Sequence, residues 1–350
     1  MAAIRPRDLL PDPLLSRLGG TAGTTAGDTA GNGAGTVFGN GARSADAEIA
    51  RTIARDIAKL ADVGYLNVAL PPEFGGLGCT LRQAACGQRR LARHAPDTAV
   101  AVSAHLYWTG AAADAYRSGD DSVRWILLEA ARGALFASGH REPGGDLRFA
   151  DPGSRCEADG QTGYRFRSPG VLSGVTPAWD WMAVHGITGD RRPDTVLAFA
   201  GRGSRCTPAF RVARVLSAGA PSDIFTSSAV TWGNSLLASV EYSHARRAFN
   251  DALIALDRRH DASSGTHPLD QWPVAEASLR LDAMKAKIAE ITHPWPLVPE
   301  PGLDLGGQRL IALYTMRHQV TDGAAHAHRL IEAMSARPMA KNAILPGGPT

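Results

Sequence analysis

The sequence has few lysines and little net charge. Lysine occurs at only four positions, and arginine supplies the rest of the 37 basic residues. We attribute this bias to a GC-rich coding sequence, although an arginine can bind phosphate wherever it faces a ligand. The 37 basic and 34 acidic residues leave a formal net charge of +3. Such a balance does not indicate binding to nucleic acid or to an anionic membrane.

Cysteines and long hydrophobic runs are also scarce. The four cysteines form no C-x-x-C pair and no metal-ligand spacing, so we expect reduced thiols with structural roles. No apolar run approaches the ~18 residues of a membrane span. Residues 1–20 lack the hydrophobic region of a secretory signal. These features predict a cytoplasmic protein that does not enter a membrane.

The composition is otherwise that of a globular protein. Hydrophobic residues make up 44% of the 350 residues and charged residues only 20%, which is typical of a chain with a sizeable core. At ~150 residues per domain, the length predicts two or three domains. The 38 glycines are more than an average protein of this length would contain.

The pattern of residues changes twice along the chain. Helical spacing predicts helices at about 81–94, 97–117 and 120–132, and again at about 231–258, 270–291 and 305–335. Between them, short apolar runs separated by Gly, Pro and Ser predict strands. We therefore expect a flexible N-terminal segment (1–43), an N-terminal helical domain (44–133), a central β domain (134–230) and a C-terminal helical bundle (231–350). Segregated blocks of this kind are less common than alternating strands and helices.

Three motifs lie at the junctions of these blocks. The first is the turn Leu70–Gly78, with the sequence LPPEFGGLG, between two predicted helices. The second is Ala137–Asp146, with the sequence ASGHREPGGD, at the end of the first predicted strand. The third is Phe166–Gly174 followed by Trp179–Val184. Turns rich in Pro and Gly fix the angle between elements and expose backbone N–H groups that can bind a ligand.

In this order, the three motifs resemble those of the acyl-CoA dehydrogenase superfamily, including its flavin-dependent monooxygenase branch. The resemblance covers about residues 44–345. It implies an α+β multidomain fold with an N-terminal helical domain, a central small β-barrel and a C-terminal helical bundle. The segment from Phe210 to Val230 is shorter than the resemblance requires for the last barrel strands, so the chain looks like a divergent, shortened member.

The resemblance also implies a flavin, either FAD or FMN, and names residues that would contact it. Ser138, His140 and Arg141 occupy positions that face the flavin ring or the substrate in the family, and Arg141 stands where a Thr or Ser is usual. Ser173 sits where a hydroxyl residue normally touches the flavin. We expect these four residues to bind the cofactor and expect no metal site.

A catalytic base is harder to assign. The dehydrogenases use a Glu to remove a proton next to the thioester carbonyl, but Met339–Thr350, where most members carry it, contains no acidic residue. Glu241 lies near the alternative position, although an exposed helix residue is the simpler interpretation. His105 and His140 are the remaining candidates. His318, Asp322 and His326 share one helix face at a spacing that could chelate a metal, but no fourth ligand is evident.

Three functions are compatible with these residues. The first is a flavoprotein oxidoreductase that oxidises the CH–CH group of an acyl-CoA-type thioester and passes electrons to an electron-transfer flavoprotein. The second is a monooxygenase that uses oxygen and flavin reduced by a flavin reductase, and it needs no carboxylate base. The third is a non-catalytic scaffold that pairs with an intact relative. The resemblance further implies a homodimer or homotetramer.

Overall fold

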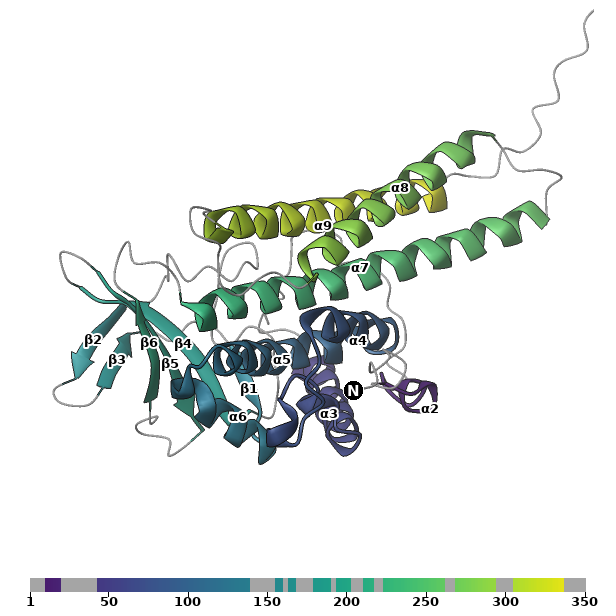
Figure 1. Cartoon of the computed structure of the whole chain (residues 1–350). Coiled ribbons are helices and arrows are strands. Elements are labelled where there is room, and N and C mark those ends of the chain that lie inside the picture. The colour runs from purple at the N-terminus through teal and green to yellow at the C-terminus, as the bar shows by residue number, and fades with distance from the viewer. Residues whose placement is uncertain are drawn as a thin grey trace, which may run out of the picture.

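The computed structural model describes residues 10–19, 43–138, 155–159, 163–167, 179–189, 193–202, 210–216, 223–261, 268–293 and 305–336. Helices come first, a six-stranded sheet follows, and three long helices complete the chain (Figure 1). The predicted order of helices, strands and helices is thus observed. None of the helices in these ranges is long and apolar enough to cross a membrane.

The first part of the chain is helical. Its α-helices are α2 (Asp12–Leu15), α3 (Arg43–Asp62), α4 (Leu81–His94), α5 (Pro96–Arg117) and α6 (Arg124–Ala131). Three short 3₁₀ helices connect them: η1 (Tyr65–Asn67), η2 (Pro72–Phe74) and η3 (Asp121–Val123). Helix α5 is buried on nearly every side, which explains why its sequence lacks a clear polar face.

The turn that joins α3 to α4 needs its glycines. Gly75 has φ 78°, which glycine adopts without strain. A Cβ at Gly76 would lie only 2.2 Å from the Leu70 carbonyl oxygen. Thr80 and Gln83 then form a capping box that starts α4. The first motif therefore has an architectural function, because it fixes the angle between two helices.

The strands form one mixed sheet. They are β1 (Phe136–Ser138), β2 (Arg155–Asp159), β3 (Gly163–Arg167), β4 (Trp181–Ile187), β5 (Thr195–Gly201) and β6 (Phe210–Leu216). The order is β3-β2-β4-β5-β6, and β1 pairs with β4 in parallel. The outer strands β3 and β6 also contact each other, so the sheet curls toward the barrel that the resemblance implies.

The two faces of this sheet pack against different groups. One face carries Val184, Val196 and Ala198, which pack with Cys156 and Phe166 inside the curled sheet. The opposite face turns toward the helices, and its buried residues join the main hydrophobic core. The alternation of side chains along each strand produces this division. We call the interface between the sheet and the helices the seam. It is lined by every second residue of β4 and β5, such as Ala183, Leu197 and Phe199.

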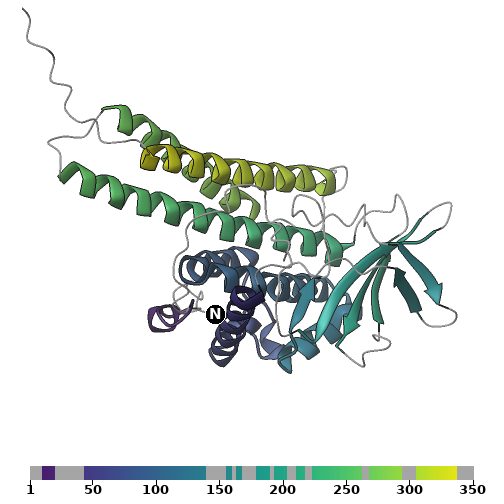
Figure 2. The same ribbon diagram turned by 180° about the vertical axis from the view of Figure 1, so that it is seen from behind.

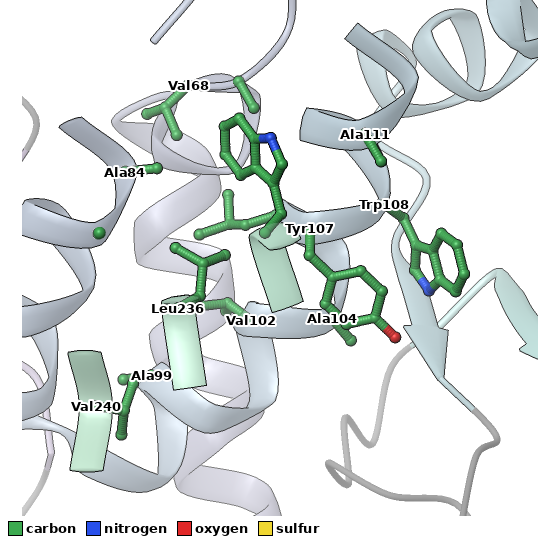
Figure 3. Packing of buried hydrophobic residues seen from close by; sticks show 14 of the residues in the cluster. Val68, Ala84, Ala99, Val102, Ala104, Tyr107, Trp108, Ala111, Leu236 and Val240 are labelled. Atoms are coloured by element: carbon green, nitrogen blue, oxygen red, sulfur yellow. The ribbon is translucent and has the colours of Figure 1, made fainter. Parts of the chain in front are cut away.

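The last part of the chain consists of α7 (Ile224–Asp261), α8 (Pro268–Ile291) and α9 (Leu305–Ala336). Both views place α7 between α4 and α5 on one side and α8 and α9 on the other (Figures 1 and 2). On the α5 side, Leu236 and Val240 of α7 pack near Val102 and Ala99 (Figure 3). Helix α7 thus connects the N-terminal helices to the bundle.

Two boundaries differ from the prediction. Residues 10–19 belong to the segment expected to be flexible, yet Leu10, Leu15 and Leu18 are buried in the main core. The Gly19 amide also donates to the buried Asp56 carboxylate at 2.9 Å. Helix α7 begins at Ile224, seven residues before the predicted position at 231, because Asp223 caps it: the Thr226 amide donates to Asp223 Oδ1 at 2.7 Å.

Candidate functional site

Ser138 ends β1 on the face of the sheet that turns toward the helices. It lies opposite Ala183 of β4 in the parallel register, and Ala183 belongs to the main core. The Ser138 side chain is 3% exposed, and its Oγ has no hydrogen-bond partner among the described residues. A buried hydroxyl without a partner costs free energy, so this oxygen fits a hydrogen bond to a bound group.

His105 lies on α5, beside the start of the same strand. Its Nε2 donates to the Leu66 carbonyl at 2.9 Å, and its Nδ1 accepts the Phe136 amide at 3.3 Å. These contacts fit the neutral ring with its proton on Nε2. Burial lowers the pKa of His105 from 6.5 to about 4. Both ring nitrogens are thus engaged in structural contacts between η1, α5 and β1.

An aromatic cluster packs in the part of the seam that lies beside this histidine. Trp125 of α6 packs against Phe136, Trp181 and Phe199 with ring centroids 5.1–6.1 Å apart. The Arg211 guanidinium lies 4.1 Å from the Trp125 ring centroid, in the range of a cation–π contact. The contacts between the rings hold the sheet against the helices and leave Ser138 at the end of a well-packed strand.

The other residues predicted to bind the flavin, His140, Arg141 and Ser173, lie outside the described residues. Their proposed contacts, and the second role of His140 as a catalytic candidate, remain predictions. The strand that precedes His140 and the strand that follows Ser173 are both described, as β1 and β4. The parallel pairing of β1 with β4 shows that the second and third motifs border the same part of the sheet.

Glu241 is not an exposed helix residue. Its Oε2 lies 2.9 Å from Nη1 of the buried Arg317 and accepts the Thr321 hydroxyl at 3.3 Å. This ion pair joins α7 to α9 inside the bundle. Because the carboxylate already has an arginine partner, the geometry gives Glu241 a structural function.

The predicted stripe on α9 divides between separate partners. His318 pairs with Asp322 at 3.0 Å on an exposed surface. His326 instead contacts Glu276 of α8 at 2.9 Å. The hydrogen bond from Arg280, and to a smaller extent the one from His326, lowers the pKa of Glu276. Within the described ranges, no three residues of the ligating types come together in a way that could hold a metal ion.

One polar junction had no local signal in the sequence. Asp114 of α5 accepts the Trp232 indole N–H at 2.8 Å and the Ser228 hydroxyl at 3.2 Å. Both donors lie on α7, more than a hundred positions along the chain. Gly110, one turn before Asp114, leaves room for the Trp232 ring, since a Cβ there would lie 2.4 Å from it. The junction fixes the register of α7 on α5.

Comparisons with known proteins agree with this architecture. Residues 40–125 match the family model of the acyl-CoA dehydrogenase N-terminal domain. A stretch of 142 residues is 30% identical to YdbM of Bacillus subtilis (strain 168), which is provisionally named an acyl-CoA dehydrogenase. That match covers 40% of this chain and only 37% of YdbM, so it concerns part of each protein.

Solved structures resemble the chain over most of its length. KijD3 in complex with FMN and a dTDP-linked amino-keto sugar aligns with a TM-score of 0.62 and 19% identity, covering 84% of this chain and 81% of KijD3. The methanesulfinate monooxygenase MsuC of Pseudomonas fluorescens aligns with a TM-score of 0.57 and 16% identity, covering 85% and 87%. At these identities the likeness concerns the fold. The chain is therefore similar to the acyl-CoA dehydrogenase N-terminal domain over residues 40–125 and shares the overall fold of these solved structures, in agreement with the resemblance of its motifs.

Proposed function

We propose that this chain is a flavin-dependent oxidoreductase. The observation that carries the proposal is the buried Ser138 hydroxyl at the end of β1, which has no partner among the described residues. Ser138 lies in the same motif as His140 and Arg141, and these residues, together with Ser173, are the proposed flavin contacts. A flavin carbonyl is an acceptor that a serine hydroxyl can satisfy. The proposed cofactor is FAD or FMN.

The first candidate reaction is the oxidation of an acyl-CoA-type thioester. It is supported by the N-terminal domain match and by the likeness to YdbM. The flavin would accept the hydride from the substrate, and an electron-transfer flavoprotein would then accept the electrons. Neither His105 nor Glu241 is assigned as the base, because both His105 nitrogens and the Glu241 carboxylate already have partners. His140 stays the candidate.

The second candidate is a monooxygenase. It is supported by the likeness to MsuC, named a monooxygenase, and to KijD3, which was solved with FMN. Such an enzyme would take reduced flavin from a separate flavin reductase and would need no carboxylate base. The functional unit in either case is proposed to be a homodimer or homotetramer.

One experiment separates these reactions. The purified protein is loaded with FAD or FMN and mixed anaerobically with a panel of acyl-CoA thioesters while the flavin absorbance is followed. Bleaching of the flavin supports the dehydrogenase. Turnover that requires oxygen and a flavin reductase, with no bleaching by thioesters, supports the monooxygenase. A protein that binds flavin in neither redox state would instead fit the non-catalytic scaffold and would contradict both enzymatic functions.

Ser138 provides the matching test of the site. A Ser138→Ala variant loses the hydroxyl but keeps the size of the buried side chain close to the original. We expect weaker flavin binding by about five- to tenfold, the usual effect of removing one hydrogen bond. Ser235→Ala is the control, because Ser235 on α7 is also fully buried and its hydroxyl has no partner among the described residues. An equal effect of both variants would contradict the assignment of Ser138.

A further inference from the structure

Arg214 faces the helices only because β6 contains a bulge. Along β6, Val212 pairs with Ala198 and packs inside the curled sheet, so regular alternation would turn residue 214 to the same side. The register of the β5–β6 pair shifts between Leu197 and Ala198. Arg214 therefore lies opposite Leu197, and Ala213 has no opposite residue on β5. Since Leu197 belongs to the core shared with the helices, the bulge turns the Arg214 side chain into the seam.

The Arg214 guanidinium contacts residues from both helical parts of the chain. Its Nη2 pairs with Asp120, which precedes η3, and its Nε pairs with Asp223, which precedes α7. Nη1 donates to the Ser122 hydroxyl at 2.9 Å and to the bulged Ala213 carbonyl at 2.6 Å. The side chain is only 13% exposed, so solvent screens these pairs less than it screens surface pairs.

Both carboxylates also cap the helix that follows them. Asp120 Oδ1 accepts the Ser122 amide at 2.9 Å, and Asp223 Oδ1 accepts the Thr226 amide at 2.7 Å. In each case the other oxygen, Oδ2, binds Arg214. One guanidinium with several fixed donors can join two carboxylates in this way, whereas a lysine ammonium is a single point charge. The guanidinium also lies 5.0 Å from the Phe225 ring.

We propose that Arg214 is a positioning residue that fixes the sheet relative to both helical parts and so sets the width of the seam that Ser138 faces. This inference rests on the proposed function, because the seam is where the flavin would bind. Arg214 itself is not assigned a contact with the flavin or the substrate. We call the cluster of Arg214, Asp120 and Asp223 the latch. It lies at β6, which is the edge strand of the sheet and does not pair with β1.

The test compares Arg214→Gln and Arg214→Lys with Arg211→Gln. Arg211 is the matched control, because it lies on the same strand and face but contacts a Trp125 ring rather than the two carboxylates. Two measurements are made on each protein: hydrogen–deuterium exchange of peptides covering η3, β6 and the start of α7, and equilibrium binding of FAD and FMN. Asp120→Asn and Asp223→Asn test the two sides of the latch separately, since asparagine keeps a capping oxygen but loses the charge.

We expect Arg214→Gln to raise exchange in all three segments and to weaken flavin binding about tenfold, because a site built across two loosened parts is poorly preorganised. Arg214→Lys should give a smaller effect, each aspartate variant should loosen mainly its own helix start, and Arg211→Gln should resemble the wild type. If Arg214→Gln lowers the melting temperature but leaves flavin affinity unchanged, the positioning function is wrong. If the wild type binds no flavin, the proposed function is wrong. The hydrogen–deuterium exchange data then test the connection through Arg214 alone, and unchanged exchange in Arg214→Gln contradicts that connection.

Discussion

At the scale of single residues, buried polar side chains make specific connections between the sheet and the helices. His105 connects η1, α5 and β1 through its two ring nitrogens. The sequence could place His105 on a helix, but its partners Leu66 and Phe136 lie 39 and 31 positions away. No local sequence pattern indicates hydrogen bonds to residues so far away along the chain. The same limit applies to Ser138, whose position at a strand end could be predicted but whose burial could not.

The buried His105 predicts acid-sensitive stability. Its pKa is lowered from 6.5 to about 4 by burial, so the folded protein favours the neutral ring. The stabilisation is complete above pH 6.5 and is lost as the pH falls toward 4, by on the order of 3 kcal/mol. His105→Gln should reduce this pH dependence, measured as the melting temperature between pH 7 and 4. His318→Gln, which changes an exposed histidine, should leave it unchanged, and identical slopes in all three proteins would contradict the account.

Replacing Gly110 with alanine is expected to disturb the packing of α5 against α7. In Gly110→Ala, the new Cβ would lie 2.4 Å from the Trp232 ring, so α5 and α7 must separate or the ring must move. We expect a loss of about 1–3 kcal/mol in the free energy of unfolding, the usual cost of overpacking, measured by denaturant titration. Gly189→Ala is the control, because nothing lies within 4 Å of its Cβ position. Equal stability of Gly110→Ala and the wild type would show that the contact between α5 and α7 is looser than described.

At the scale of elements, local signals predicted most of the helices. Helix α4 occupies the predicted residues 81–94, because its capping residue and its amphipathic spacing are both visible in the sequence. The predicted start of α7 is too late. Residues 224–230 pack against other elements, so their sequence shows no polar face at helical spacing. The bulge in β6 had no signal at all, because it arises from pairing with β5.

The N-terminal segment shows how a short element gains order from tertiary contacts. A four-residue helix such as α2 has no stability alone, yet Leu15 is 1% exposed in the core. Leu15→Ala should lower the free energy of unfolding by about 2–5 kcal/mol, as for other buried leucines. Val63→Ala, at an exposed position, should change it little. If Leu15→Ala is as stable as the wild type in denaturant titration, residues 10–19 do not contribute to the core.

At the scale of the whole molecule, the order of the blocks and the three motifs predicted the fold that the solved structures share. The site was predicted less completely. Ser138 lies in the seam between sheet and helices, whereas His140, Arg141 and Ser173 lie outside the described residues. How the parts are held together depends on pairs such as Arg214 with Asp120, which only the folded chain brings into contact.

The central claim is that this fold binds a flavin in the seam that Ser138 faces. The most direct measurement is isothermal titration calorimetry of the 350-residue chain with FAD and with FMN, each in the oxidised and, under anaerobic conditions, the reduced state. A flavin site in the seam predicts saturable binding of at least one of these four ligands, with one flavin per chain, and weaker binding of that ligand by Ser138→Ala. No binding of any of the four would contradict it.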